Sequence, residues 1–313
     1  MLYYVVRRVF VLPPVMLTVA LVVFCLLYIT PGDPAAMIAG DQASPEDIER
    51  VRVAMGLDKP FFVRFAGWAW QLVKGDLGTS IFANQPVMQM IGQRVGPTLS
   101  LLSLALVISV VIAVPLGMMA AWNRGKMADR MFTLVTVLAF SFPVFVVGYV
   151  FAFSFSTTLK WLPVQGYTPL SDGFISFLDH LILPAMTLGV SYAAILARTT
   201  RSSMLDVLSQ DYVRTAIAKG ASPRVILFRH SLKNAAIPII TVIGLGLATL
   251  IGGSVITESV FVIPGIGRLT LDAILHRDYP VIQGVVLLFS ASYVAVNLLI
   301  DIIYTMVDPR IRY

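Results

Sequence analysis

Long stretches of this chain contain no Asp, Glu, Lys, Arg or His, and their length is the strongest constraint on its fold. They lie between Arg8 and Asp33, Arg94 and Arg124, Arg130 and Lys160, His180 and Arg198, Lys233 and Glu258, and Asp278 and Asp301. Each provides, or nearly provides, the roughly 20 helical residues that cross a hydrocarbon core. Because a membrane-spanning segment must satisfy its own backbone hydrogen bonds, we expect six transmembrane helices near residues 9–30, 97–121, 131–156, 180–198, 235–257 and 280–305.

The composition supports an all-α integral membrane protein. Hydrophobic residues make up 58% of the chain and charged residues only 13%, whereas soluble globular proteins carry about a quarter charged residues. The first apolar stretch is too long for the h-region of a secretion signal and lacks an A-x-A-like cleavage site, so we interpret it as an uncleaved span. The single cysteine, Cys25, falls inside this stretch, so we expect neither a disulfide nor a thiolate metal site within the chain.

Basic residues gather in alternate connecting segments. Two precede the first span, three lie between the second and third spans, and seven lie between the fourth and fifth: Arg7 and Arg8; Arg124, Lys126 and Arg130; Arg198, Arg201, Arg214, Lys219, Arg224, Arg229 and Lys233. The opposite short segments hold only Lys160, Arg268 and Arg277, balanced by five acidic residues. This positive-inside pattern predicts that both termini are cytoplasmic. The segment 31–96 is too long for the rule to apply, and the alternation of the spans places it outside the inner membrane. Since topology accounts for the net charge of +6, the charge does not indicate a nucleic-acid partner.

The long segment 31–96 contains two predicted helices. Pro31-Gly32-Asp33-Pro34 is typical of a turn that ends the first span. Ser44-Pro45-Glu46-Asp47 predicts a helix start with a capping serine, and Gly56 predicts the end of that helix. Residues 60–74 are rich in Phe and Trp and predict a second helix, either at the membrane interface or as a docking surface for an external partner. The chain thus divides into a first span (1–30), a periplasmic segment (31–96) and a five-helix core (97–313).

Small residues recur at every fourth position in two of the predicted spans. They are Ala185, Gly189, Ala193 and Ala197 in the fourth span, and Gly244, Ala248 and Gly252 in the fifth. Faces of this kind allow membrane helices to approach closely. We therefore predict helix packing through Gly189, Ala193, Gly244 and Gly252, within the subunit or across a dimer.

The connection between the fourth and fifth spans, at about 199–234, predicts two short helices. The first covers residues 210–219 and ends at Gly220, in the position where a left-handed conformation is favoured. Ser222-Pro223 then starts a second helix that runs to about Asn234, and Pro238 opens the fifth span. Both helices are basic and partly apolar, so they are suited to lie in a groove on another protein.

The chain contains none of the sequence motifs that we searched for as signs of catalysis. It lacks the G-x-x-x-x-G-K-S/T loop that holds nucleotide phosphates and the H-E-x-x-H zinc motif, and its three histidines lie in separate segments. We therefore expect no catalytic residue, no metal site and no ATPase activity in this chain. Asp301, with Asn297 one turn before it, is the one acidic residue within a predicted span, where it either has a functional role or pairs with a basic loop residue.

The connection also resembles a known element. The stretch from Asp211 to Gly220, followed by Arg229-His230 and by Asn234 to Pro238, resembles the ATPase-coupling loop of bacterial ABC importer permeases. More narrowly, the chain is similar to the dipeptide/oligopeptide/nickel permease family in its first-subunit form. Matching motifs run along the whole chain: Pro31 to Ala35, Gly56 to Pro60, Gly75 to Gly78 with Ser80, Trp161 to Pro163, Gly252 to Ser254 with Glu258 and Phe261, Pro264 to Arg268, Arg277 to Pro280, Asn297, Asp301, Tyr304, and Asp308 to Arg310.

One departure concerns the start of the coupling loop. The general permease pattern begins with Glu-Ala-Ala, whereas this chain has Arg214-Thr215-Ala216, and the usual following Leu-Pro is replaced by Ala236-Ile237-Pro238. Contacts through that glutamate are therefore not carried over to this chain.

The resemblance implies a type I ABC importer permease fold and a set of residues that contact an ATPase. These are Asp211, Tyr212, Arg214, Ala216, Lys219, Gly220, Arg229, His230 and Asn234. It further implies a heterodimer with a second homologous permease, two cytoplasmic subunits that bind ATP and Mg²⁺, and a periplasmic substrate-binding protein. Di- and oligopeptides are the expected cargo, with nickel, glutathione and opines as alternatives that the family also serves.

An ion-coupled carrier or a channel is the alternative class of function. A carrier is expected to hold several paired intramembrane ionisable groups or helices broken at the membrane midplane. Only Asp301 meets the first expectation in this sequence. A membrane scaffold without transport is a third class that composition leaves open. The ATP dependence of uptake in proteoliposomes distinguishes all three.

Overall fold

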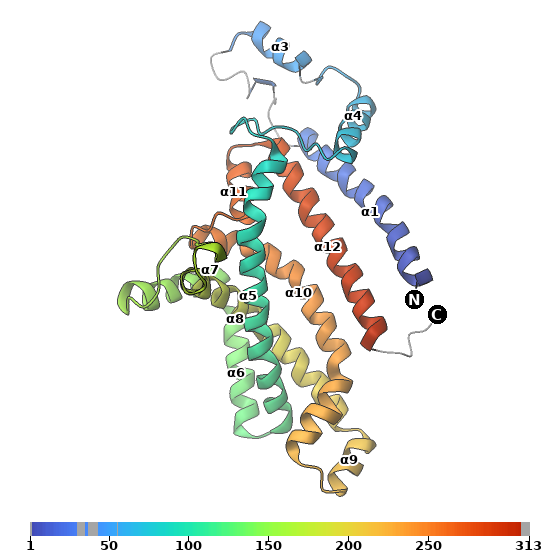
Figure 1. The fold of residues 1–313 in the computed structure, drawn as a ribbon, viewed down its shortest axis with the longest axis vertical. Coiled ribbons are helices and arrows are strands. Elements are labelled where there is room, and N and C mark those ends of the chain that lie inside the picture. The colour runs from blue at the N-terminus through green and yellow to red at the C-terminus, as the bar shows by residue number, and fades with distance from the viewer. Residues whose placement is uncertain (1, 30–34, 37–42, 55, 308–313) are drawn as a thin grey trace. The chain divides into compact units, whose positions relative to one another are not determined.

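The computed structural model describes residues 2–29, 35–36, 43–54 and 56–307, and most of them are helical (Figure 1). The chain forms two compact units. One, here called the core unit, comprises Arg94–Arg268 with Ala295–Tyr313, and the other, the flanking unit, comprises Leu2–Gln93 with Leu269–Val294. Three helices contribute residues to both units: α5 (Val87–Trp122), α11 (Ile266–Leu275) and α12 (Tyr279–Val307).

The core unit is organised around α8 (Phe174–Leu208), which packs against α6 (Met127–Ser141), α7 (Val144–Phe151) and α10 (Lys233–Val260). Its apolar span is 67% buried, against 28% for the span in α5. A helix that is apolar all round and mostly covered by other helices lies at the centre of a bundle. α8 is therefore the central helix of the core unit.

Four described helices are long and apolar enough to cross a membrane. They are Val87–Trp122, Phe174–Leu208, Val225–Val260 and Tyr279–Ile303. A fifth candidate is the pair Met127–Ser141 and Val144–Thr158, and a shorter apolar helix, Leu12–Cys25, lies within α1 (Leu2–Ile29). The structure thus gives four spans, or five with the bent pair, and the count of six remains a prediction.

The third predicted span, 131–156, is not one straight helix. α6 ends at Ser141, α7 begins at Val144, and the two helices are bent by 99°. Phe142 between them is extended, with φ −88° and ψ 129°, and Pro143 follows it. A residue before proline is driven out of the helical region by the proline ring, and this explains the break. α7 then continues into a π-helical segment, η1 (Ala152–Thr158).

The fifth span also begins differently from the sequence prediction. Residues Val225–Leu232 form a π-helical segment, η3, which continues into α10 at Lys233 without interruption. Pro238 therefore lies inside the helix and does not open it. Membrane helices tolerate proline because local π adjustments and neighbouring groups satisfy the carbonyls that it leaves free.

The flanking unit contains the two helices predicted in the segment 31–96. α3 (Pro45–Ala54) starts at Ser44, whose backbone N–H donates to Asp47 Oδ2 (3.3 Å) while the Asp47 N–H donates to Ser44 Oγ (3.2 Å). This reciprocal cap, together with the Ser44 hydroxyl bond, holds the pKa of Asp47 below its ordinary value. Gly56 follows the helix with φ +63°. The turn predicted at residues 31–34 lies outside the described residues.

The aromatic stretch forms α4 (Phe61–Val73), as predicted, and its rings pack against α1. Phe24 of α1 lies 5.5 Å from both Phe61 and Phe65, centroid to centroid, and 5.2 Å from Trp68. After α4 the chain is attached to the start of α12 by Asp278, which accepts bonds from the Ser80 hydroxyl and from the Ile81 N–H (3.2 Å). The flanking unit is therefore held together through aromatic packing and one buried carboxylate.

Candidate functional site

The predicted coupling loop forms two helices that meet at Gly220. α9 (Asp211–Ala218) ends with the Gly220 N–H donating to the Ile217 carbonyl (2.9 Å) and the Ala221 N–H donating to the Ala216 carbonyl (3.1 Å). These two bonds define a Schellman cap, and Gly220 has the left-handed φ of +80° that the cap requires. The left-handed conformation predicted for Gly220 is confirmed.

Two buried residues attach this helix pair to the core unit. Val213 of α9 is fully buried and Ile226 of η3 is 2% exposed, and both elements contact the end of α8. Other apolar side chains of the pair point outward, because Tyr212 is 45% exposed, Ile217 51% and Phe228 62%. An exposed apolar surface of this kind is typical of a site that contacts a partner protein or the membrane.

Polar contacts fix the arrangement of the two helices. The Asn234 side-chain amide donates to the Tyr212 hydroxyl (3.0 Å) and to the His230 carbonyl (2.7 Å), which connects η3 and α10 to α9. Arg214 pairs with Asp211 across 3.4 Å, with both side chains exposed. Lys219 and Arg229 are exposed and Ala216 is half-buried. The nine residues predicted for the coupling loop are therefore brought to one small region of the core unit.

An ion pair that we did not predict as a site connects α6 to α8. Arg201 Nε lies 2.6 Å from Asp129 Oδ1, and Arg201 Nη2 donates to Asp129 Oδ2 across 2.9 Å. The Gly125 N–H donates to the same carboxylate (3.0 Å), and the Asp129 side chain is only 8% exposed. A bidentate geometry with an added backbone donor makes this a strong contact. It holds the end of α8, from which the coupling loop leaves, against the start of α6.

The small-residue faces have different surroundings. A Cβ atom on Gly189 would lie 2.8 Å from the Ala105 carbonyl oxygen, and the Ser109 hydroxyl donates to the Gly189 carbonyl (2.8 Å). Ala193 and Gly244 are also buried, the latter beside Ile300. Gly252 is exposed, and a Cβ added there would meet no described atom within 4 Å. α5 and α8 thus approach closely at Gly189, whereas no other helix packs directly against Gly252.

Gly252 lies in an open groove of about 420 Å³ between the α6–α7 bend, α8 and α10. Its walls are mostly apolar, and only Ser191, Tyr192 and Thr249 among the lining residues carry a hydroxyl group. The lining residues are Ala139, Phe140, Phe142, Pro143, Val144, Leu188, Ser191, Tyr192, Ile195, Thr249, Leu250, Gly252, Gly253 and Ile256. Pockets of this size accommodate small organic molecules. The core unit therefore has an apolar groove beside Gly252 that is large enough for a small organic molecule.

The far end of α10 contains a second polar group that sequence reasoning did not select as a site. Glu258 is fully buried, accepts a hydrogen bond from the Thr98 hydroxyl (2.7 Å) and accepts another from the Arg268 N–H (3.0 Å). The Ile266 N–H donates to Thr98 Oγ1 (2.8 Å), so the carboxylate and the hydroxyl together satisfy the start of α11. Because Gly265 has no side chain, the Glu258 carboxylate occupies the position that a Cβ atom would take there.

Asn297 and Asp301 are half-buried on α12. Among the described residues there is no group of three or more His, Cys, Asp or Glu side chains arranged to hold a metal ion. The sequence signals for the two missed polar groups were available, because Glu258 ends an uncharged stretch and Asp129 is the one acid in a basic segment. Their partners, Thr98 and Arg201, lie too far away in the sequence to be matched without the structure.

Comparison with known proteins then places the chain. The family model described as "Binding-protein-dependent transport system inner membrane component" matches residues 113–313, and the N-terminal model of the same transport systems matches residues 1–102. The chain belongs to this permease family. Together the two models cover nearly the whole length of the chain.

Relatives and solved structures agree with this assignment. The chain is 49% identical over 310 residues to the probable peptide ABC transporter permease protein y4tP of Sinorhizobium fredii, covering 99% of both chains. It is 42% identical over 313 residues to the glutathione transport system permease protein GsiC of Salmonella typhimurium, covering 100% of both. A solved structure of the MetNI methionine ABC transporter in an inward-facing conformation matches 71% of this chain and 97% of that chain, with a TM-score of 0.60 at 19% identity. The permease is therefore a multi-pass inner-membrane protein with the fold of type I ABC importer permeases.

Proposed function

We propose that this permease forms half of the translocation pathway for di- or oligopeptides in an ATP-driven importer. The observation that carries the proposal is the 49% identity to a probable peptide permease across 99% of both chains. Glutathione is the second candidate cargo, supported by the 42% identity to a glutathione permease over the full length. Nickel and opines remain further alternatives within the family.

The coupling loop, about 199–234, is the proposed docking element for the ATPases. It is basic, it exposes apolar side chains, and it is attached to its own subunit through the buried Val213 and Ile226. In this proposal ATP and Mg²⁺ are bound by partner subunits, and the permease itself hydrolyses no ATP. A helix in a groove is a common mode of protein recognition and suits two short helices joined at a fixed cap.

The second proposed partner is a similar but distinct permease. The groove at Gly252 is open to one side, and a pathway for a small peptide needs a cavity of roughly 300 Å³ or more, enclosed all round. A second permease placed against α6, α7 and α10 would close it. A cysteine at Gly252 is then expected to form a cross-link to the second permease, and none to form from a cysteine at the buried Gly189.

Reconstitution tests the whole proposal. The permease is placed in proteoliposomes with its two ATPases, the second permease and the periplasmic binding protein, and uptake of labelled dipeptide and glutathione is measured with and without ATP. We expect ATP-dependent dipeptide uptake that disappears when the second permease is omitted. Uptake without ATP would instead indicate a carrier or channel, the class for which a bent span is also typical, and full uptake by this permease alone would contradict the heterodimer.

The proposed orientation places both termini in the cytoplasm and residues 31–96 in the periplasm. A cysteine at Glu49 is expected to react with a membrane-impermeant thiol reagent in intact spheroplasts, and a cysteine at Lys219 to react only after lysis. Both positions are exposed, so the difference reports sidedness and not burial. The reverse labelling pattern would overturn the topology.

A further inference from the structure

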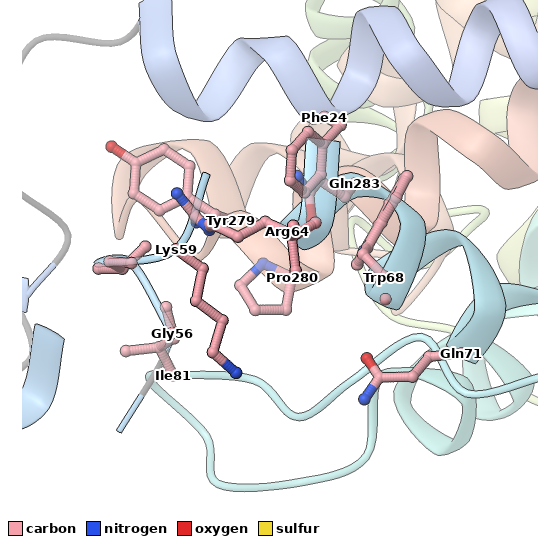
Figure 2. A pocket seen from close by; sticks show the side chains of 13 residues that line it. Phe24, Gly56, Lys59, Arg64, Trp68, Gln71, Ile81, Tyr279, Pro280 and Gln283 are labelled. Atoms are coloured by element: carbon pink, nitrogen blue, oxygen red, sulfur yellow. The ribbon is translucent and has the colours of Figure 1, made fainter. Parts of the chain in front are cut away.

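A pocket in the flanking unit combines basic, amide and aromatic side chains (Figure 2). It has a volume of about 460 Å³ and lies between the end of α1, the residues from Gly56 to α4, and the start of α12. Its lining residues include Lys59 and Arg64 and no aspartate or glutamate. The pocket is therefore suited to an anion.

The two cations are held at the pocket by their surroundings. The Arg64 guanidinium carbon lies 5.8 Å from the centroid of the Phe24 ring, a cation–π contact. The Lys59 side chain lies over Gly56, where an added Cβ would be 3.9 Å from its ammonium nitrogen. Both side chains line the pocket together with Pro280 of α12 (Figure 2). A compact ammonium beside a planar guanidinium is a common arrangement for phosphate recognition.

A second, apolar groove of about 510 Å³ is lined by α1, α4 and α12 and also by Leu77 and by Met88 and Ile91 of α5. On α1 it involves Pro13, Leu17 and Ala20, which continue at helical spacing from Phe24 of the first pocket. On α12 it involves Gly284, Leu287 and Ala291, which continue in the same way from Pro280. The charged pocket and the apolar groove therefore follow one another along the same faces of α1 and α12.

The dimensions match one leaflet of a bilayer. From Phe24 to Pro13 is eleven residues of helix, which at 1.5 Å per residue is about 16 Å, close to half of the roughly 30 Å hydrocarbon core. Beside this path α4 exposes large apolar side chains, with Phe62 80%, Trp70 61% and Val73 77% exposed. Aromatic side chains exposed on an amphipathic helix are typical of the membrane interface.

We propose that the flanking unit holds a structural phospholipid of the outer leaflet, with its phosphate at Lys59 and Arg64 and an acyl chain in the groove between α1 and α12. The position in the outer leaflet rests on the proposed orientation of the permease. The binding itself does not, because it involves only contacts within the flanking unit. Such a lipid would fill the space that α4 leaves between itself and the two membrane helices.

Native mass spectrometry of the delipidated full-length permease tests the site. The protein is titrated with long-chain phosphatidylglycerol in detergent, and the occupancy of the tightest adduct is measured. Lys59→Gln is expected to weaken this adduct about tenfold by removing one charge-assisted contact, whereas Lys59→Arg retains it. Ala69→Phe, which fills the groove, is expected to weaken it as well. The matched controls are Lys74→Gln and Ala66→Phe, which lie in the same segment but line neither pocket.

Competing ligands distinguish the sources of the phosphate. Inorganic phosphate at millimolar concentration and diacylglycerol are each expected to leave the phosphatidylglycerol adduct in place. Displacement by phosphate alone would identify a free-anion site, and equal binding of diacylglycerol would show that the cations do not recognise a headgroup; either result overturns the proposal. It is overturned too if Lys59→Gln leaves the lipid adduct unchanged but weakens cross-linking of the permease to its periplasmic binding protein.

Discussion

The two ends of the continuous helix from Val225 to Val260 are built in opposite ways. At the coupling end, Tyr212, Arg214 and Phe228 expose both polar and apolar groups, and most of the contacts are between near neighbours in sequence. At the other end, Glu258 is fully buried and its hydrogen bonds come from residues of the same chain. Buried polar groups with all their bonds satisfied specify one local structure, whereas an exposed surface with few internal bonds is available to a partner. The difference is what the proposed docking of the ATPases at the Val225 end would require.

The largest expected effect is at the buried end. Glu258→Ala removes the acceptor for the Thr98 hydroxyl and the Arg268 N–H and leaves a cavity, so we expect a loss of about 3–5 kcal/mol of unfolding free energy. Thermal unfolding of the purified permease in detergent measures the effect. Glu49→Ala is the control, since that carboxylate pairs with Arg52 on an exposed face. If both variants unfold at the same temperature, the hydrogen bonds of Glu258 do not stabilise the buried end of the helix.

The next effect concerns the anchor beneath the coupling loop. Arg201→Ala leaves the nearly buried Asp129 carboxylate without its cation, and we expect a loss of about 3 kcal/mol. Exchanging the two residues, Asp129→Arg with Arg201→Asp, is expected to recover part of that loss. A double-mutant cycle then gives a coupling energy of about 1–3 kcal/mol. Arg198→Ala, on the exposed side of the same helix, serves as the control; an equal loss there would mean that the ion pair is not the anchor.

A smaller effect on stability, with a large effect on coupling, is expected at Gly220. Gly220→Val forces a branched side chain into φ +80°, at roughly 1–2 kcal/mol. No described atom lies within 4 Å of a Cβ added at Gly220. The expected effect of valine therefore comes from backbone strain and not from a steric clash with a neighbouring residue. Membrane insertion should persist while co-purification of the ATPases falls. Gly220→Asn tolerates the left-handed conformation and should restore co-purification; normal transport by the valine variant would rule out the docking geometry.

The smallest effect on stability is expected at Arg214. Its ion pair with Asp211 is exposed on both sides, and such pairs contribute less than about 1 kcal/mol. Arg214→Gln should therefore leave thermal unfolding nearly unchanged while reducing binding of the ATPases, measured by co-purification. The similarly exposed pair of Asp47 and Arg50 provides the control variant Arg50→Gln. A large loss of stability in Arg214→Gln would show that the coupling end is held by its own contacts.

Much of the fold follows from local sequence. Uncharged stretches identify the long apolar helices, and the Ser44 cap and the Gly220 cap follow from backbone rules that involve only neighbouring residues. The bend at Phe142 was missed because hydropathy is continuous across it, although Pro143 was a local signal. The Thr98–Glu258 contact joins residues 160 positions apart, and the Arg201–Asp129 contact joins residues 72 apart. Such contacts depend on how helices pack, which a single sequence does not specify.

The uninterrupted passage from η3 into α10 has a mechanical consequence. η3, which belongs to the proposed docking element, and the apolar span of α10 form one helix of 36 residues, about 54 Å long at 1.5 Å per residue. If this helix is pushed at one end and pivots near the other, a tilt of only about 5° moves the far end by about 5 Å. An ATPase that displaces η3 by that amount would therefore need to tilt the whole helix by only about 5°. In the proposed orientation η3 lies in the cytoplasm and Glu258, which accepts a hydrogen bond from the first turn of α11, lies at the opposite end of the same helix. A displacement of η3 would then be transmitted to α11 through a single continuous helix.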